Sequence, residues 1–454
     1  MVFFKAYDMR GTFGVDFDLA TVYKVGKALP AVVGGRRWLV GRDARTSSPA
    51  VRRALVAGLR AAGAEVTDLG LATTPMVYFF TAEEGFDGSV MVTASHNPPA
   101  DNGLKVSRRG ARPVGYESGL AEVEARVAAD AAPVPATAVD GPPPAAAADP
   151  ARLARYVAWL KAHAGAADAG GLRLAVDCSD GMASLVARAL FPGAVLLNDV
   201  PDGAFPHHAP NPLRAEARAQ LAAAVRAGGL DCGVIFDGDA DRCMFVDETG
   251  TFIQPDYLIP VLAATFRPAP APFRVIHDVR TSRAAIEAIR ALGAEPVIGR
   301  VGHAYAKALL REVDAVCGGE LAGHYYFRDF HGCDSGELAA LRILGAFARA
   351  KASGRRVSQF MAPVCGKYAN SGELNFTVAD KEAAIARVLA AAKAFGPETG
   401  RCAIDGVRLE FDAGWISVRP SNTEPYLRIV AECDTPARLA AWRTALAAAV
   451  APAS

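Results

Sequence analysis

Short apolar runs that end in an acidic residue occur three times along the chain. They span residues 37–43, 172–177 and 273–278, and each has the pattern of a buried strand. A helical pattern follows each run, over residues 50–62, 184–190 and 281–292, and the run Thr46-Ser47-Ser48 is expected to cap the first helix. Gly63, Gly193 and Gly293 then open a further apolar strand. This repeated order predicts three similar α/β domains with right-handed crossovers.

The last part of the chain lacks this repeat. Strand patterns occur at residues 372–378, 407–411, 415–418 and 427–432, a helical pattern at 381–395, and the end is helical, which predicts an α+β module. Two Pro/Ala-rich stretches separate the earlier units, a solvated linker expected over residues 127–150 and a shorter break at 268–272. We therefore predict domains at residues 1–140, 150–255, 256–362 and 363–454, with the second boundary anywhere between 250 and 272.

Composition and charge narrow the class of protein. The chain has 454 residues, which is longer than a domain with a single hydrophobic core usually is. Of these residues, 51% are hydrophobic. Its net charge of +1 provides no field suited to nucleic acid or an anionic membrane. The eight cysteines form no C-x-x-C pair, so reduced thiols are expected. With no signal-peptide pattern and no apolar run of membrane length, the chain is expected to be a cytoplasmic enzyme or binding protein.

The first candidate site follows the apolar run at residues 89–92. Its sequence is Thr93-Ala94-Ser95-His96-Asn97-Pro98, and the proline prevents a helix from starting at once. Ser95 is therefore expected on an exposed loop at the carboxyl end of a strand, where open α/β sheets bind ligands. Ser95 beside His96 is a candidate nucleophile; the alternative is an ordinary hydrogen-bonded turn.

The second candidate site is a row of carboxylates after another apolar strand. Asp237, Asp239 and Asp241 alternate along the chain, so an extended backbone would place them on one face. Three carboxylates together require a cation, and oxygen ligands favour Mg²⁺. An EF-hand is excluded because Arg242 stands where that loop requires Gly and strands flank the loop. A solvated acidic turn remains the alternative.

Two further motifs carry polar groups on glycine- or proline-bounded turns. In Gly318-Gly319-Glu320-Leu321-Ala322-Gly323-His324, Glu320 and His324 could bind hydroxyl groups, although a core or surface histidine is equally compatible. The segment 419–425 combines Arg419 with Ser421, Asn422 and Thr423, and Arg428 follows it. Such a turn can bind phosphate, and a plain proline-bounded turn is the alternative.

Taken together, these motifs resemble the α-D-phosphohexomutase family, and most closely its phosphomannomutase/phosphoglucomutase branch. The resemblance covers essentially the whole chain, in order, at residues 7–11, 93–98 with 103–105, 237–242, 318–324 and 419–425. The run 326–330 with 333–336 resembles the phosphomannomutase branch in particular. The resemblance implies an α/β fold: three related α/β domains with mixed sheets plus a smaller α+β C-terminal domain around a central cleft.

The resemblance also implies a reaction and a set of partners. Ser95 would be a phosphoserine that moves a phosphoryl group reversibly between C1 and C6 of mannose and glucose phosphates through a hexose 1,6-bisphosphate. Mg²⁺ would be held by that phosphate with Asp237, Asp239 and Asp241. Hexose phosphates would be its partners, with neither nucleic acid nor membrane involved, and a monomer is expected rather than a large oligomer.

Roles for further residues follow from the motif matches. Arg10, Lys105 and Arg242 would supply positive charge to the transferring group, and Lys105 and His324 are both candidates for the general acid and base. The remaining expected ligand contacts are Tyr7, His96, Arg280, His303, Glu320, Leu321, Ala322, Gly323, Arg419, Ser421, Asn422, Thr423 and Arg428.

The sequence departs from the family pattern at two places. Leu321 and Ala322 replace the usual Met and Ser, and loss of one hydroxyl contact costs about 0.5–1.5 kcal/mol. Arg280 stands where many relatives have Lys. Three alternatives stay open: a phosphoglucosamine mutase, which shares these motifs; a metal-dependent phosphohydrolase, which would need ligands for two metals; and an inactive sugar-phosphate-binding protein.

Overall fold

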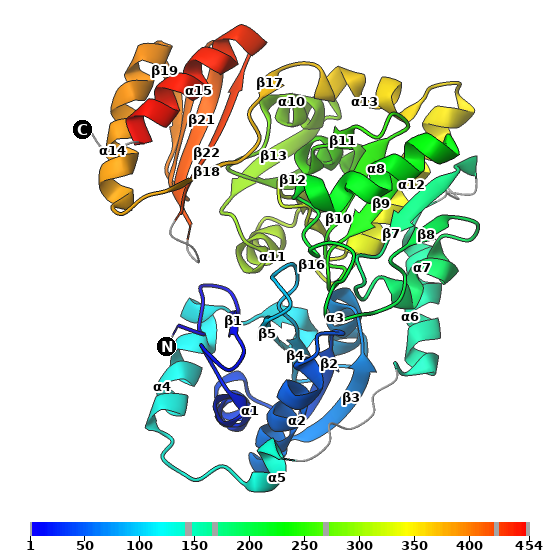
Figure 1. The fold of residues 1–454 in the computed structure, drawn as a ribbon, viewed down its shortest axis with the longest axis vertical. Helices are drawn as coiled ribbons and strands as arrows, with labels where there is room; N and C mark the ends of the chain where they lie inside the picture. Colours follow the sequence, from blue (N-terminus) through cyan, green and yellow to red (C-terminus); the bar gives the residue numbers. More distant parts are fainter. Residues whose placement is uncertain (1, 141–147, 166–170, 267–271, 422–425, 451–454) are drawn as a thin grey trace.

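The structure is a computed structural model that describes residues 2–140, 148–165, 171–266, 272–421 and 426–450. These residues form four β-sheets, one after another along the chain, each covered by helices (Figure 1). Three sheets are mixed and belong to α/β units, and the fourth is antiparallel. The predicted fold class, three related α/β units followed by a smaller α+β unit, is confirmed.

The first sheet has the strand order β1-β5-β4-β2-β3, with β6 beside β5. Trp38 and Val40 of β2 face one core, with α1 and α2, while Leu39 between them faces another, with α3. This alternation follows from the period of two in a strand. The elements are β1 (Met9–Thr12), α1 (Leu19–Val33), β2 (Arg37–Arg42), α2 (Ser48–Ala61), β3 (Glu65–Leu71), α3 (Thr74–Glu83), β4 (Gly88–Val92), β5 (Asp101–Arg108), β6 (Arg112–Pro113), α4 (Ala121–Ala129) and α5 (Ala136–Val139).

The second sheet has the order β11-β10-β9-β7-β8, parallel from β9 to β8 and antiparallel from β9 to β11. Each predicted element of this repeat is present within two residues. The elements are α6 (Pro150–His163), β7 (Leu174–Asp177), α7 (Ser184–Leu190), β8 (Val195–Leu197), α8 (Ala215–Gly228), β9 (Cys232–Phe236), β10 (Cys243–Asp247) and β11 (Phe252–Ile253).

The third sheet repeats the scheme with the order β13-β12-β14-β15-β16. One continuous core joins the side chains of the first three units, from Phe79 through Phe236 to Phe347. The elements are α9 (Ile259–Ala264), β12 (Phe273–Asp278), α10 (Arg283–Ala291), β13 (Ala294–Gly299), α11 (His303–Glu312), β14 (Cys317–Gly319), β15 (Tyr325–Phe327), β16 (Cys333–Asp334), α12 (Gly336–Ala352) and α13 (Val357–Cys365).

The fourth sheet has the order β17-β22-β21-β20-β19, with β18 also beside β22. Its core combines the sheet with α14 and α15. The short β17 and the Glu- and Arg-containing β19 have no strand-like apolar pattern and were not predicted. The elements are β17 (Ala369–Asn370), β18 (Leu374–Thr377), α14 (Lys381–Ala392), β19 (Glu398–Cys402), β20 (Val407–Phe411), β21 (Gly414–Pro420), β22 (Tyr426–Cys433) and α15 (Pro436–Val450).

Two local expectations differ from the structure. Residues 127–140 are only partly a solvated linker, because Val127 and Ala138 are buried against the α1–α2 core while most residues between them are exposed; residues 141–147 lie outside the described part. Ser47 precedes α2 but makes no capping hydrogen bond with its side chain. Its hydroxyl instead accepts a hydrogen bond from Asn102, so a tertiary contact replaces the local cap.

Two other features bear on the class of protein. In the described part of the chain, no helix is long and apolar enough to cross a membrane. All eight cysteines are free, and six of them are buried.

The loop after β4 is held in place by one buried arginine. Arg45 is fully buried, and its guanidinium donates hydrogen bonds to the backbone carbonyls of Ser95, Asn97, Pro98 and Asp101 at 2.5–2.9 Å. Its Nε atom donates to a carboxylate at the end of β2. These bonds give the 95–101 segment a defined path without regular secondary structure, because each carbonyl has a partner.

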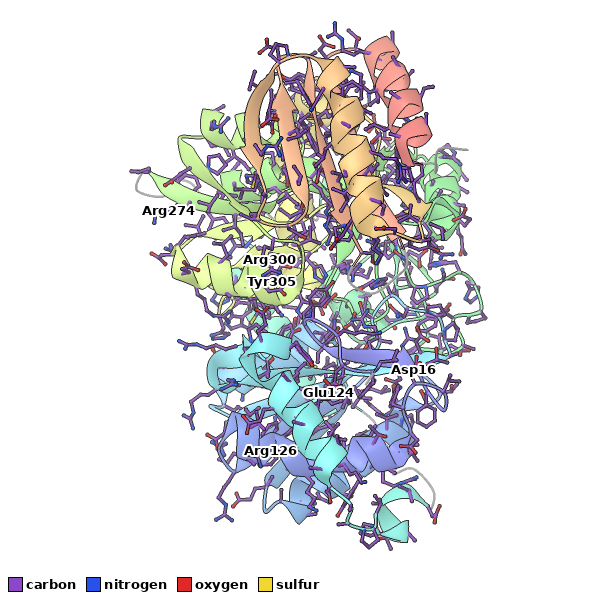
Figure 2. All side chains as sticks on the ribbon, turned by 90° about the vertical axis from the view of Figure 1, so that its left-hand side faces the viewer. Asp16, Glu124, Arg126, Arg274, Arg300 and Tyr305 are labelled. Atoms are coloured by element: carbon purple, nitrogen blue, oxygen red, sulfur yellow. The ribbon has the colours of Figure 1, made fainter. Side chains whose placement is uncertain are left out.

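Replacement of this arginine is predicted to destabilise the protein. Arg45→Met would leave several buried carbonyls without donors, and each costs about 1–3 kcal/mol. We expect a loss of at least about 3 kcal/mol, measured by denaturant unfolding. The matched control is Arg126→Met, since Arg126 lies on the outer face of α4 in an exposed pair with Glu122 and should change stability by less than about 0.5 kcal/mol (Figure 2). Equal effects of the two variants would contradict this role.

Candidate active site

Ser95 lies where the first unit meets the second. It follows β4, as predicted, but it is fully buried rather than exposed, because the loop after β9 covers it. Its Oγ atom donates a hydrogen bond to Asp237 Oδ2 at 2.7 Å. The backbone of Ser95 has a φ of 53°, a left-handed conformation that is uncommon for serine and that places strain at this position.

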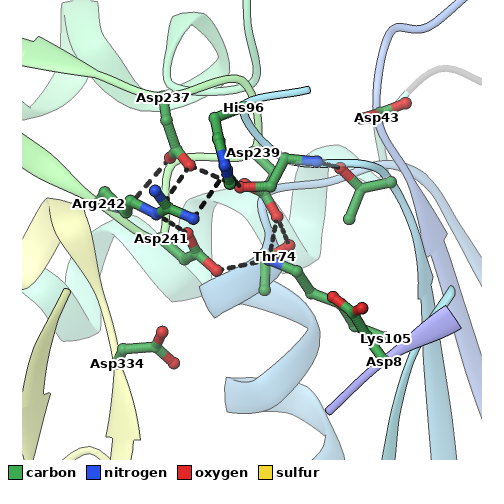
Figure 3. Close-up of polar contacts among 12 residues, drawn as sticks. Asp8, Asp43, Thr74, His96, Lys105, Asp237, Asp239, Asp241, Arg242 and Asp334 are labelled. Carbon is green, nitrogen blue, oxygen red and sulfur yellow. Dashed lines mark hydrogen bonds and ion pairs between the residues drawn. The ribbon is translucent and has the colours of Figure 1, made fainter. Parts of the chain in front are cut away.

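The three aspartates predicted to share a metal are brought together. Asp237, Asp239 and Asp241 are fully buried, and one carboxylate oxygen from each lies within 4.8 Å of the others. The reason differs from the expected extended chain: the segment is a turn, with Ala240 in the left-handed region at φ 64°. Figure 3 shows the cluster enclosed by polar side chains from both units.

Lys105 provides much of the charge that compensates these carboxylates. Its Nζ atom, on β5, lies 2.6 Å from Asp239 Oδ2 and 2.5 Å from Asp241 Oδ2. Burial opposes the charged amine, but the two carboxylates outweigh burial and raise the pKa of Lys105. Lys105 therefore remains protonated at neutral pH. Thr74, the first residue of α3, donates to Asp239 as well, at 2.5 Å.

The remaining carboxylate is less well compensated. Burial raises the pKa of Asp237 well above its usual range, and the negative charges of Asp241 and Asp239 raise it further. For Asp241, burial also opposes ionisation, but the Lys105 charge outweighs it and lowers the pKa. The cluster thus lacks enough positive charge for all three carboxylates, which is the condition in which a cation binds.

The donor set fits a divalent metal ion. Among the described residues, Oδ1 of Asp239 and Oδ1 of Asp241 are buried and accept no hydrogen bond. Buried carboxylate oxygens without a donor are expensive, and an ion would satisfy them. All-oxygen ligands favour Mg²⁺ over zinc, and the cluster is therefore a candidate metal site.

Two arginines complete the positive side of the site, and a neutral histidine contacts one of them. Arg242 donates from Nη2 to His96 Nδ1 at 2.7 Å, and its Nε lies 3.5 Å from Asp237 Oδ2. Burial, followed by the Arg242 charge, lowers the pKa of His96 well below its usual range, so His96 is neutral. Arg10, on β1, is oriented by Asp8 at 2.6 Å and donates to Asn97 at 3.0 Å.

The third unit contributes two buried histidines. Nδ1 of His324 lies 2.7 Å from Oδ2 of Asp334, on β16. His303 begins α11, with its ring centroid 6.0 Å from that of His324 and 5.7 Å from that of Tyr7. Burial, followed by the Lys307 charge, lowers the pKa of His303 well below its usual range.

The loop between β14 and β15 holds Glu320 rigidly. One Glu320 oxygen accepts from the Gly302 backbone at 2.7 Å and the other from the Tyr326 hydroxyl at 2.6 Å. Gly323 has a φ of +87°, and a Cβ atom there would lie 2.7 Å from the end of Met244. The Leu321 side chain packs on Trp415 and Val430, so it contacts the fourth unit. Ala322 lies at the half-exposed tip of the turn.

Arg280 and the fourth-unit arginines form a second group of positive charge. Arg280 is buried and pairs with Asp278 at 2.7 Å and with Glu373 at 2.9 Å. Arg428 pairs with the other oxygen of Glu373 at 3.0 Å, and Arg419 lies opposite Arg428 on the neighbouring strand. Buried Ser421 follows β21, whereas Asn422 and Thr423 lie outside the described residues.

Several residues that shape the site were not singled out from the sequence. Asp8 lies within a matched motif, and Asp334 lies within the run that resembles the phosphomannomutase branch. Their position in these motifs could therefore have identified both as candidate site residues. Thr74 and Glu373 offered none, because each reaches the site only through packing between units. Lys307 offered none because its contact with Asp334 joins two separate elements of the third unit, α11 and β16.

Comparison with known protein families gives consecutive matches along the chain. Residues 1–133, 154–250 and 254–368 match phosphoglucomutase/phosphomannomutase alpha/beta/alpha domains I, II and III, and residues 373–449 match the C-terminal domain.

Individual relatives agree. "Phosphohexose mutases" of Xanthomonas campestris pv. campestris strain B100 is 38% identical over 97% of both chains, and a phosphomannomutase of Escherichia coli strain K12 is 35% identical over 98% of both. A crystal structure of a phosphoglucomutase/phosphomannomutase family protein from Burkholderia thailandensis superposes with a TM-score of 0.81 at 31% identity, covering 100% of this chain and 98% of that one. The chain therefore belongs to the phosphoglucomutase/phosphomannomutase family.

Proposed function

We propose that this protein moves a phosphoryl group reversibly between C1 and C6 of mannose and glucose phosphates, with Ser95 as the carrier. The observation that supports this most directly is the contact between Ser95 Oγ and Asp237, at 2.7 Å, within a buried cluster of three carboxylates. A hydroxyl placed there can carry a phosphoryl group whose charge is shared with a metal ion. The 35–38% identity to enzymes named phosphomannomutase and phosphohexose mutase supports the same reaction.

The proposed cofactor is Mg²⁺, held by Asp237, Asp239, Asp241 and the phosphate on Ser95. When bound, it would supply positive charge to the transferring phosphoryl group. Lys105, Arg10 and Arg242 surround the same place and would neutralise the phosphoryl oxygens. Transfer of this kind depends on alignment and charge compensation more than on covalent chemistry by the protein.

The chemical step exchanges one P–O bond for another. A sugar hydroxyl attacks the phosphorus on Ser95, the bond from phosphorus to Ser95 Oγ breaks, and the hydroxyl proton must pass to a base. Lys105 is held protonated by two carboxylates, so it is unsuited to accept that proton. His324, oriented by Asp334, is the better candidate. The hexose 1,6-bisphosphate then turns over and returns its other phosphoryl group to Ser95.

The second group of arginines is proposed to hold the phosphate that is not reacting. Arg419 is buried, and its Nε atom lies 3.4 Å from Asp405 Oδ2 but makes no hydrogen bond among the described residues. Ser421, Asn422, Thr423 and Arg428 complete the proposed phosphate contacts, and Arg280, Tyr7 and His303 would contact the sugar phosphate from the third and first units. Glu320, with both oxygens already fixed, would accept hydrogen bonds from ring hydroxyls that mannose and glucose share.

A phosphohydrolase with two metals is less well supported. The described residues contain a second group of possible ligands, Asp241, His324 and Asp334. Asp334 already pairs with His324 and with Lys307, each at 2.7 Å, so its charge is compensated without an ion.

We further propose that the protein is a cytoplasmic monomer with domain boundaries at residues 1–140, 150–255, 256–362 and 363–454.

Loss of the carrier hydroxyl is predicted to stop the reaction. Ser95→Ala should lower kcat by several orders of magnitude, because transfer would lose its covalent intermediate. The control is Ser107→Ala, another buried serine on β5 that lies outside the carboxylate cluster. Coupled assays with glucose 1-phosphate and intact-mass detection of the phosphoryl group would measure both. Near-normal turnover of Ser95→Ala would refute the assignment.

Removal of one carboxylate is predicted to weaken the binding of the metal ion while leaving the fold intact. Asp239→Asn removes a ligand charge, so the Mg²⁺ concentration for half-maximal activity should rise at least about tenfold, the effect of about 1.4 kcal/mol. Titration of activity with MgCl₂ after EDTA treatment measures it, and thermal unfolding reports the fold. Full activity of EDTA-treated wild-type enzyme without added metal would show that this role is wrong.

Both sugars are predicted to be substrates. They differ only at C2, and strong discrimination needs a buried polar group that the wrong sugar leaves unpaired. We expect kcat/KM for mannose 1-phosphate and glucose 1-phosphate to differ by less than about a thousandfold, which corresponds to about 4 kcal/mol. Arg419→Ala should raise KM for both sugars by similar factors, as loss of a shared anchor does. A larger preference for either sugar would refute dual specificity.

A further inference from the structure

Lys307 is a fully buried charge to which the proposed reaction assigns no role. It lies one turn after His303 on α11, and its Nζ atom is 2.7 Å from Oδ1 of Asp334. The same ammonium lies 3.7 Å from the ring centroid of Tyr78, on α3 of the first unit. Because a buried lysine is costly without compensation, a partner as close as Asp334 indicates that the pair acts as a unit.

Asp334 divides its two oxygens between Lys307 and His324. Oδ2 lies 2.7 Å from Nδ1 of His324, and both side chains are buried. Burial opposes ionisation of Asp334, but the Lys307 charge and the His324 hydrogen bond outweigh it and lower the pKa of Asp334. An ionised carboxylate only accepts, so Nδ1 of His324 carries a hydrogen, and the neutral form of this imidazole has its lone pair on Nε2.

Helix α3 connects this arrangement with the carboxylate cluster. Thr74 and Tyr78 are four residues apart, so they lie on the same face of α3 and about 6 Å apart along its axis. Thr74 donates a hydrogen bond to Asp239, and Tyr78 covers Lys307. One turn of α3 therefore sets the distance between the acidic cluster, which Thr74 contacts, and Lys307, which Tyr78 contacts.

We propose that Lys307 is a positioning residue for phosphoryl transfer, and this rests on the proposed function. It holds Asp334 against Nδ1 of His324 and so fixes the orientation of the imidazole that presents Nε2 to the attacking sugar hydroxyl. The contacts of its ammonium within the described residues are with Asp334 and Tyr78, not with the three aspartates. It acts through Asp334 and through its contact with α3, in the way that a buried carboxylate orients a catalytic imidazole.

The test compares three variants and one control with mannose 1-phosphate as substrate. Asp334→Asn should lower kcat about 100-fold, the scale of general base catalysis, and leave KM within about threefold, because the sugar contacts are intact. Lys307→Met should lower kcat at least tenfold, and it should also reduce thermal stability because Asp334 is left unpaired. Arg311→Met, one turn farther along α11, removes contacts to the carbonyls of His331 and Lys307 and should keep the wild-type kcat.

The double variant Lys307→Met with Asp334→Asn separates positioning from folding. It leaves no buried unpaired charge, so its unfolding temperature should return toward that of the wild type while kcat stays at least tenfold low. A double variant with wild-type kcat would overturn the inference, as would an unaffected Lys307→Met. If Lys307→Met fails to fold, Asp334→Asn and the double variant decide. Wild-type protein without mutase activity would instead refute the proposed function itself.

Discussion

Three carboxylates buried at one point are the constraint on which this structure depends. Asp237, Asp239 and Asp241 cannot all ionise away from water unless positive charge is brought to them. Among the described residues, the second unit, which carries them, supplies Arg242, and the first unit supplies Lys105. The cluster therefore gains the charge of Lys105 only when the units are packed together, and the need to offset its negative charge contributes to their mutual orientation.

The same requirement explains why the surroundings of Ser95 are rigid. A loop that must place a hydroxyl 2.7 Å from Asp237 cannot depend on local turn preferences alone. Arg45 donates hydrogen bonds to four backbone carbonyls of the loop, and Asp237 accepts the hydrogen bond of the Ser95 hydroxyl. The left-handed backbone at Ser95 is tolerated because these contacts over-determine it.

The fourth unit is attached to the third by hydrogen bonds to backbone carbonyls and by apolar packing, rather than through the acidic cluster. Arg408 donates to the carbonyls of Val279 and Thr281, and Leu321 packs on Trp415. These contacts do not involve the acidic cluster, so the proposed phosphate anchor at Arg419 is connected to Ser95, the proposed carrier, mainly through the third unit. The proposed site, which would hold a reacting and a non-reacting phosphate at once, is thus assembled from separately packed parts.

The sequence by itself determined the repeated strand–helix–strand order, the fold class, the positions of the four motifs and which three aspartates cluster. These are local signals, since hydrophobic period, turn residues and spacing act within about twenty residues. Only the tertiary structure decided that Ser95 is buried, that Val127 and Ala138 pack against α1 and α2, and that Lys105 of the first unit pairs with Asp239 and Asp241. It also decided the link from Lys307 through Asp334 to His324. The physical reason is that these contacts join separate elements of the fold, and the compensation of the acidic cluster by Lys105 joins residues more than a hundred positions apart, which no local pattern brings together.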